Sequence, residues 1–173
     1  MSKEFPILPG QTPLPADWKQ DLKVEVSTYG ELNELEAFNI QKASEKYLFG
    51  KRKRWEIENP ETLKRIHFDM FCDVWKWAGQ YRDHETNIGV LPYEIGAEVT
   101  KLTNDYKYWI EKNTFDDVRE LAIRFHHRLV QIHCYPNGNG RHARIVADII
   151  VSMHSEKPLS WSQKNMGQKS KDR

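Results

Sequence analysis

The sequence predicts an all-α domain with a short β-hairpin flap, and three observations support this prediction. Apolar residues recur at spacings of three and four over most of residues 27–154, as they do on one face of an α-helix. Residue types that cap helices precede several of these segments. Glycine, proline and asparagine gather between the segments, above all at residues 79–93 and 134–140. A chain of 173 residues is the size of one such domain.

Prolines and a helix-capping residue predict the structure of residues 1–47. Residues 1–26 are expected to form an extended N-terminal arm, since their prolines oppose both a helix and a central strand. A helix is expected over residues 27–47, capped by Ser27 or Thr28, with Glu31 in the place of a capping-box acid. The apolar side of this helix is predicted to comprise Leu32, Leu35, Phe38 and Ile40.

The next helix has the clearest signals. It begins at Pro60 with Asn59 as its cap, and Gly79 is expected to end it. Residues 81–93 contain Gly89 and Pro92 and therefore fit a short hairpin or an irregular flap better than a helix.

The second half of the chain predicts three more helices. The first covers residues 97–112, the second runs from a cap at Thr114 to about residue 133, and the third covers about residues 139–154. Residues 156–173 form a polar C-terminal tail. The domain itself is thus expected to span residues 27–155.

Charge and hydropathy exclude several partners. The 26 basic residues are balanced by 25 acidic ones, so nucleic acid is not expected to bind. The basic run at residues 51–54 is better explained as a solvated helix end or loop than as a nucleic-acid patch. The most apolar run, residues 145–153, is too short to span a bilayer, and no signal peptide is visible. A soluble, cytoplasmic protein without a membrane partner is expected.

The two cysteines, Cys72 and Cys134, lie far apart and lack partners at metal-ligand spacing. Two free thiols in a reducing compartment is the preferred interpretation, and a single disulfide between them stays open.

Residues 137–141, Asn-Gly-Asn-Gly-Arg, combine features that bind phosphate. The glycines let the backbone approach a ligand, and successive amides form a nest for anions. The helix that follows adds free N–H groups and the positive end of its dipole. Arg141 and Arg144 share its first turn, where cations are unfavourable by roughly 0.3–1 kcal/mol each unless an anion binds. The alternative is a turn whose arginines pair with nearby acids, and spacing alone does not decide.

His133 precedes this loop at the end of the preceding helix. Because histidine titrates near neutral pH, His133 suits a general base that activates an attacking hydroxyl. A zinc site is the competing interpretation, but neither an HExxH pattern nor paired cysteines support it.

Residues 133–144 read His-Cys-Tyr-Pro-Asn-Gly-Asn-Gly-Arg-His-Ala-Arg. They resemble the signature of the Fic family, His-Pro-Phe-x-Asp/Glu-Gly-Asn-Gly-Arg-x-x-Arg. Residues 77–82 and 87–89 resemble the segment that leads into the family's flap. The resemblance covers about residues 30–153, and the chain is most similar to the small Fic proteins called mobile mystery protein B.

The resemblance implies a Fic-type helical bundle with its active-site loop between two helices. It implies a protein adenylyltransferase that transfers AMP from ATP to a Ser, Thr or Tyr hydroxyl of a target protein. His133 would take the hydroxyl proton, while Arg141 would hold the β-phosphate and Arg144 the γ-phosphate. The anion hole around the phosphates would be formed by Gly138, Asn139 and Gly140.

The resemblance also implies how targets and regulators act. The flap would dock the target as an added strand through Thr86, Asn87, Ile88 and Gly89. Residues 27–31 resemble the family's inhibitory pattern, so Glu31 is a candidate inhibitor that would compete with the γ-phosphate for Arg144. A plain capping box explains Glu31 equally well. An antitoxin or another regulatory partner is left open.

Asn137 stands where the family has the acid that holds Mg²⁺ between the phosphates. An amide oxygen is a weaker ligand for Mg²⁺ than a carboxylate, so metal binding by Asn137 stays open. Cys134 and Tyr135 replace Pro and Phe of the signature. Two alternatives to AMP transfer therefore remain, a catalytically weak nucleotide binder and a related phosphoryl or phosphocholine transferase. The complete Gly-Asn-Gly-Arg favours AMP transfer.

Overall fold

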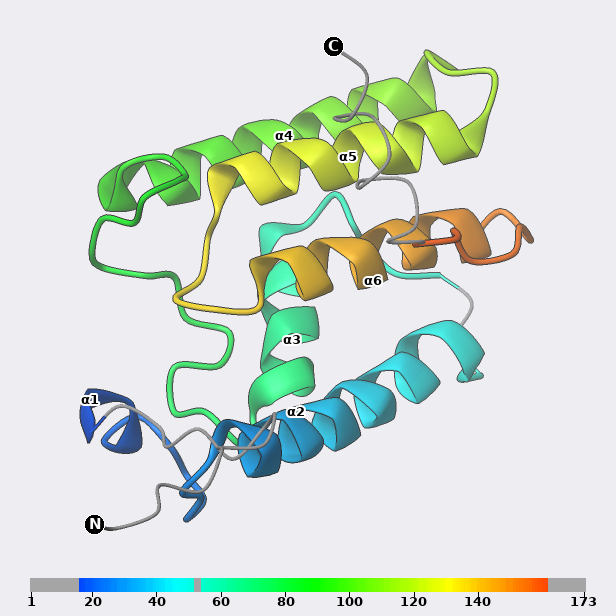
Figure 1. The fold of residues 1–173 in the computed structure, drawn as a ribbon. Helices are drawn as coiled ribbons and strands as arrows, with labels where there is room; N and C mark the ends of the chain where they lie inside the picture. The colour runs from blue at the N-terminus through cyan, green and yellow to red at the C-terminus, as the bar shows by residue number, and fades with distance from the viewer. Residues whose placement is uncertain (1–15, 52–53, 162–173) are drawn as a thin grey trace, which may run out of the picture.

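The computed structural model describes residues 16–51 and 54–161, and this part of the chain is mostly helical (Figure 1). The α-helices are α1 (Ala16–Lys19), α2 (Tyr29–Ser44), α3 (Pro60–Phe71), α4 (Ile95–Glu111), α5 (Val118–Ile132) and α6 (Asn139–Ser152). A π-helical turn at Glu45–Phe49 extends α2, and a 3₁₀ turn at Pro92–Glu94 precedes α4. An isolated β-bridge joins Leu22 to Trp75, and the described residues contain no strand. The helical fold class is confirmed.

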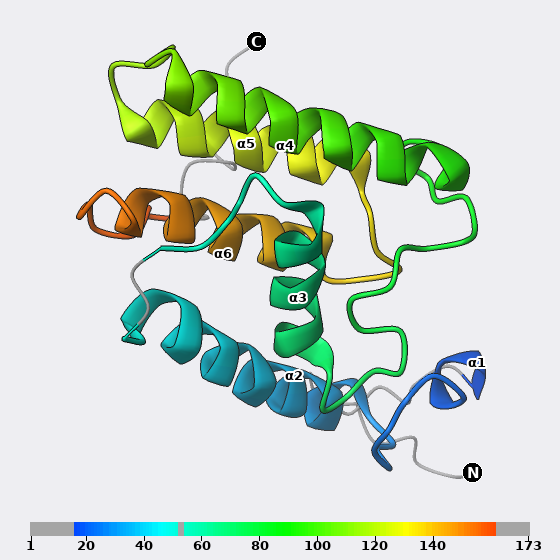
Figure 2. The same cartoon turned by 180° about the vertical axis from the view of Figure 1, so that it is seen from behind.

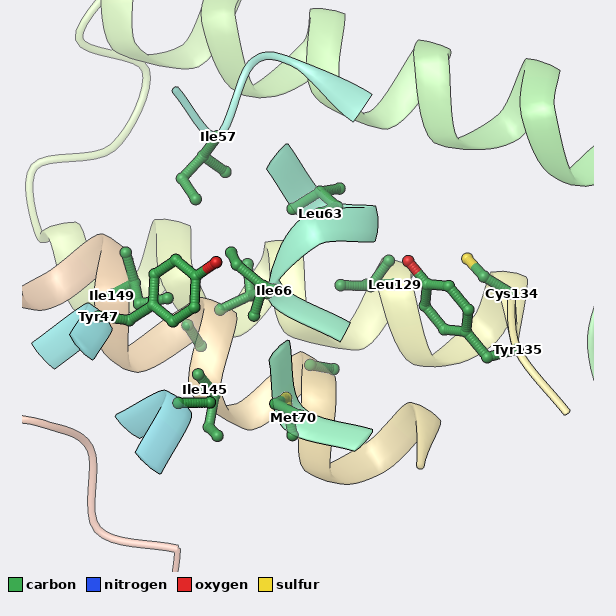
Figure 3. Packing of buried hydrophobic residues seen from close by; sticks show 14 of the residues in the cluster. Tyr47, Ile57, Leu63, Ile66, Met70, Leu129, Cys134, Tyr135, Ile145 and Ile149 are labelled. Carbon is green, nitrogen blue, oxygen red and sulfur yellow. The ribbon is translucent and has the colours of Figure 1, made fainter. Parts of the chain in front are cut away.

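The helices form layers around one core. In both views, α4 and α5 lie side by side at one side of the molecule and α2 lies at the opposite side, with α6 between them (Figures 1 and 2). α3 crosses between these layers, and its Leu63, Ile66 and Met70 are fully buried. Figure 3 shows Ile66 between Leu129 of α5 on one side and Tyr47 and Ile149 on the other, with Leu63 above it and Met70 below it. Cys134 and Tyr135 of the loop between α5 and α6 are buried in the same core.

Helix α2 begins as predicted but buries a different face. Thr28 caps it, and the Thr28 and Glu31 side chains each accept from the other's backbone N–H, which completes the capping box. Half of the predicted apolar side is wrong, because Leu35 and Phe38 are 38% and 63% exposed. Leu32 is buried and Ile40 packs against the core, as predicted. The residues that α2 buries are Leu32, Glu36, Asn39 and Ala43. Asn39 bonds the backbone of Asp69 and Asp73, so partners in other elements set which face turns inward.

Helix α3 begins at Pro60 with Asn59 as its cap, as predicted, but ends at Phe71 and not at Gly79. The chain leaves the helix because its backbone pairs with residues 21–23 instead. The Lys23 N–H donates to the Val74 carbonyl at 2.8 Å, and the Lys76 N–H donates to the Asp21 carbonyl at 2.9 Å. These long-range bonds satisfy the groups that further helical turns would have paired.

Helix α5 is capped by Asp117 and not by Thr114. The Asp117 carboxylate accepts from the N–H of Arg119 at 2.8 Å. The Thr114 N–H instead donates to the Trp109 carbonyl, so Thr114 belongs to the end of α4. The predicted cap was wrong because the preceding helix uses that residue to close its own last turn.

The predicted β-hairpin flap does not form in the described residues, where residues 81–91 make bends and irregular segments without paired strands. The irregular alternative is what the structure has. The Arg82 guanidinium donates to the carbonyls of His84 and Val90, groups that a hairpin ladder would have paired with backbone.

Residues 1–15 of the expected arm and residues 162–173 of the expected tail lie outside the described residues. The described parts of the arm and the tail contact the helical domain. The Trp18 ring packs edge-on against Tyr29 and Trp75. The Trp161 indole N–H donates to the Asp148 carboxylate of α6.

Neither a disulfide nor a membrane-spanning helix is present in residues 16–51 and 54–161. Cys72 and Cys134 are free thiols, which agrees with the preferred interpretation of the sequence. No described helix is both long and apolar enough to cross a bilayer.

Two neutral histidines are buried where α3 meets the loop before α6. His67 and His142 are 0% and 1% exposed. The His142 Nε2 bonds the Leu63 carbonyl at 2.9 Å, while its Nδ1 has no partner among the described residues. Burial lowers the pKa of His142 from its usual 6.5 to about 4 and lowers the pKa of His67 well below its usual value.

This burial predicts a loss of stability in mild acid. Below its usual pKa, about 6.5, an unfolded histidine binds a proton that the folded site resists. Stability is therefore complete above pH 6.5 and falls as the pH drops toward 4, by up to about 1.4 kcal/mol per pH unit for each histidine.

His142→Phe should remove one histidine's share of this slope, measured by urea unfolding at pH 7 and pH 5. The exposed His127 is the control, and His127→Gln should keep the wild-type slope. If His142→Phe loses as much stability between pH 7 and pH 5 as the wild type, the pH dependence does not come from the burial of His142.

Candidate active site

The loop between α5 and α6 begins and ends in left-handed backbone. His133 closes α5 with φ 54° and ψ 61°, and Gly138 opens α6 with φ 79°. A Cβ on Gly138 would lie 2.4 Å from the Phe71 ring, so only glycine fits there. A left-handed histidine is uncommon and persists only where its neighbours hold it.

Buried side chains hold this loop from the core. The Asn139 amide accepts from the Tyr135 N–H at 2.9 Å and donates to the Tyr135 carbonyl at 2.7 Å. The His67 ring stacks on the Tyr135 ring with centroids 3.6 Å apart. His67 Nδ1 accepts from the Gly79 N–H, so its Nε2–H donates to the Asn137 carbonyl at 3.1 Å. The loop is thus held in place by contacts within the chain itself.

Above the loop lies an open cavity of about 290 Å³ whose wall is made by His133 and the residues that follow it. The other lining residues are Pro136, Asn137, Gly138, Asn139, Gly140, Arg141 and Arg144. The backbone N–H groups of Asn139, Gly140 and Arg141 have no acceptor within the described part of the chain. A Cβ on Gly140 would meet no atom within 4 Å, so packing does not require glycine there. Free amides and an uncovered backbone are what close approach of a phosphate needs.

The two arginines of the cavity differ in how they are held. Arg141 pairs with Glu36 of α2 at 2.5 Å, and its guanidinium lies over the Phe71 ring. Glu36 is buried, and its second oxygen accepts from the Trp75 indole N–H at 2.7 Å. Arg144 is exposed and forms no ion pair with a described residue. Arg141 is thus oriented in advance, whereas Arg144 is available to an incoming anion.

The cavity does not fit a metal held by the protein. Its lining residues include no carboxylate. The Asn137 Oδ1 already accepts from the Gly138 N–H at 2.6 Å, and the described residues contain no cluster of three metal-ligating side chains. Mg²⁺ prefers charged oxygen ligands, and here only bound phosphates could supply them.

The flap binds His133 directly. The buried Arg82 donates from Nε to the His133 carbonyl at 2.6 Å, and its backbone N–H donates to the Cys134 carbonyl. The Thr86 hydroxyl lies 3.4 Å from His133 Nδ1. A Cβ on Gly89 would lie 2.7 Å from the His133 Cβ. Burial, and then the Arg82 charge, lower the pKa of His133, so its imidazole is neutral near pH 7.

The structure brings most of the predicted site residues together. His133, Asn137 and the Gly138–Arg141 turn line the same cavity as Arg144. Of the flap residues, Thr86 and Gly89 contact His133, while Asn87 and Ile88 are exposed. Glu31 does not join them here, since its carboxylate accepts from the N–H groups of Ser27 and Thr28.

Sequence reasoning missed three residues that shape the site, namely Glu36, Arg82 and His67. The recurrence of Leu32, Glu36 and Asn39 at helical spacing could have shown that a carboxylate lies on the buried face of α2. Nothing local identified the partners of Arg82 or His67, because every contact they make with the motif spans more than 50 residues.

Glu36 gives a direct prediction. Glu36→Ala leaves the buried Trp75 indole N–H without an acceptor and frees Arg141, so stability should fall by about 1–3 kcal/mol. Urea unfolding measures this loss. Glu34→Ala, an exposed acid on the same helix, should change stability by less than about 0.5 kcal/mol. Equal losses of stability in the two variants would contradict the conclusion that Glu36 holds Trp75 and Arg141 in place.

Solved structures with this fold include Fic domains from Bartonella. The N-terminal Fic domain of Bep8 from Bartonella sp. 1-1C has a TM-score of 0.68 at 18% identity, over 83% of this chain and 76% of its own. BepC from Bartonella tribocorum, solved with bound AMPPNP, has a TM-score of 0.62 at 18% identity, over 75% of this chain and 70% of its own. An N-terminal Fic domain from Bartonella quintana, solved with bound ADP, has a TM-score of 0.61 at 18% identity, with the same two coverages. At such identities the likeness shows the fold.

The match at the level of sequence is broader than the motif. Residues 57–151 match the Fic/DOC family. This range is more than half of the 173 residues, and it runs from the segment before α3 through the flap to α6. The chain therefore belongs to the Fic/DOC family.

Proposed function

We propose that this chain is a protein adenylyltransferase, which transfers AMP from ATP to a Ser, Thr or Tyr hydroxyl of a target protein. One observation carries the proposal: a neutral histidine and a phosphate cradle without acids line one open cavity. The structural similarity to BepC with bound AMPPNP, and to a Fic domain with bound ADP, supports a nucleotide in the corresponding place.

The reaction follows from the groups around the cavity. His133 takes the proton of the target hydroxyl, and the hydroxyl oxygen attacks the α-phosphorus of ATP. The bond from that phosphorus to the bridging oxygen of the β-phosphate breaks, and pyrophosphate leaves. A phosphodiester then joins AMP to the target side chain. No covalent enzyme intermediate is required, so positioning and charge stabilisation supply the catalysis.

The cradle provides charge where the reaction needs it. The free amides at the start of α6 face the phosphates, and Arg141 holds the β-phosphate. Arg144, which pairs with no acid among the described residues, holds the γ-phosphate. Cations in the first turn of α6 oppose its dipole, and bound phosphate removes this conflict.

Four narrower proposals accompany the reaction. The exposed flap residues Asn87 and Ile88 dock the target beside His133. The chain belongs among the small Fic proteins called mobile mystery protein B and works in the cytoplasm, where ATP is supplied. A regulatory partner such as an antitoxin, or Glu31 after it leaves the α2 cap, restrains the site by reaching Arg144.

The proposal predicts that intact-mass analysis with ATP and Mg²⁺ shows a gain of one AMP on the protein or its target. His133→Ala should reduce this gain at least about a hundredfold, because the attacking hydroxyl loses its base. Stabilisation by ATP should persist in the variant, since His133 is not needed to hold the phosphates. His127→Ala, on the exposed side of α5, is the control. Undiminished transfer in His133→Ala would exclude His133 as the base.

A second candidate function is nucleotide binding with weak catalysis. It is favoured by the cavity's lack of any carboxylate that could hold Mg²⁺. A binder of this kind would be stabilised by ATP with little dependence on Mg²⁺, and it would transfer no AMP.

Asn137→Asp tests this second candidate. The new carboxylate should support Mg²⁺ between the phosphates and create transfer that depends on the metal, measured by intact mass with and without Mg²⁺. Asn137→Ala, which removes the oxygen ligand, should show no gain. If Asn137→Asp transfers no more AMP than the wild type in Mg²⁺, the missing carboxylate is not what limits activity.

A further inference from the structure

The Thr86 side chain contacts the one histidine that lines the phosphate cavity. Its hydroxyl donates to the carbonyl of Ile88 at 2.6 Å, and the same oxygen lies 3.4 Å from His133 Nδ1. A carbonyl oxygen only accepts, so the single hydroxyl proton of Thr86 belongs to the bond with Ile88. Thr86 therefore presents only lone pairs to His133.

These lone pairs select one form of the His133 ring. A neutral imidazole carries one N–H, and which nitrogen holds it depends on the partner of the other nitrogen. A proton on Nδ1 makes a hydrogen bond with Thr86, whereas a proton on Nε2 would set two lone pairs face to face. The Nδ1–H form leaves the Nε2 lone pair free, and Nε2 has no partner among the described residues.

The rest of the flap keeps Thr86 in this place. Val90 donates its N–H to the Ile132 carbonyl, and the buried Arg82 guanidinium bonds the His133 carbonyl. Gly89 fits against the His133 Cβ with no room for a side chain. The 3.4 Å separation is longer than an ordinary hydrogen bond, as is common for catalytic contacts without bound substrate, which tighten in the reactive complex.

We infer that Thr86 is a positioning residue, whose hydroxyl holds His133 in the Nδ1–H form so that Nε2 takes the proton of the target hydroxyl. This inference rests on the proposed function for its catalytic consequence. The proton moves from the target oxygen to Nε2, and the Nδ1–H bond to Thr86 is kept in the resulting imidazolium. Thr86 thus acts through His133 and touches neither ATP nor the reacting phosphorus.

Nitrogen-15 NMR of the full chain at pH 8 reads the ring form without any need for transfer activity. Wild-type His133 should show a protonated Nδ1 and an unprotonated Nε2. Thr86→Val, which keeps the shape and removes the hydroxyl, should populate the Nε2–H form, and Thr86→Ser should restore the wild-type pattern. Glu85→Gln, at an exposed neighbouring position in the flap, is the control and should leave the pattern unchanged.

Transfer kinetics supply the second measurement. Thr86→Val should lower kcat at least about tenfold with little change in KM for ATP, and Thr86→Ser should recover most of the loss. An Nε2–H form in the wild type, or an unchanged ring form in Thr86→Val, would overturn the inference. A raised KM for the target with an unchanged ring form would also overturn it and would assign Thr86 to docking alone. Absence of AMP transfer in the wild type would count against the proposed function, while the NMR result would still decide the role of Thr86.

Discussion

The arrangement of the site depends on the buried guanidinium of Arg82. It donates to the carbonyls of His84 and Val90 at the two ends of the flap, and to the carbonyl of His133 at the end of α5. No carboxylate pairs with it among the described residues, so these carbonyl dipoles are what compensate its burial. Because one side chain satisfies all three groups, the flap and the left-handed turn at His133 are stabilised together.

The charges around the cavity are arranged so that they favour a bound anion. Helix α6 has no acid in its first turn, where α2 and α3 each have one, and it has two arginines that line the cavity. One of these, Arg141, is oriented by Glu36, whose burial and second bond to Trp75 prevent it from moving into the cavity. The other, Arg144, has no acid to neutralise it within the described residues. A bound phosphate would compensate both the dipole and the free guanidinium.

Three histidines near the loop are neutral for the same reason, burial, but differ in their partners. His67 accepts on Nδ1 from the backbone and donates from Nε2, so it joins the α3 side of the core to the loop. His142 forms a hydrogen bond only through Nε2, with the Leu63 carbonyl inside the core. His133 alone lines the cavity, and its partners come from the flap. The environment therefore separates one histidine suited to chemistry from two that support the structure.

The sequence by itself determined the helical class and the cap at Asn59, and it narrowed the cap of α2 to Ser27 or Thr28, because each depends on residues within a few positions of one another. It also placed a glycine-rich loop between α5 and α6. It could not determine which face of α2 is buried, nor where α3 ends. Those outcomes depend on partners far along the chain, such as Trp75 for Glu36 and the segment 21–23 for the backbone after Phe71. Only the tertiary structure placed the flap against His133, since buried polar groups choose whichever partner the folded chain brings near.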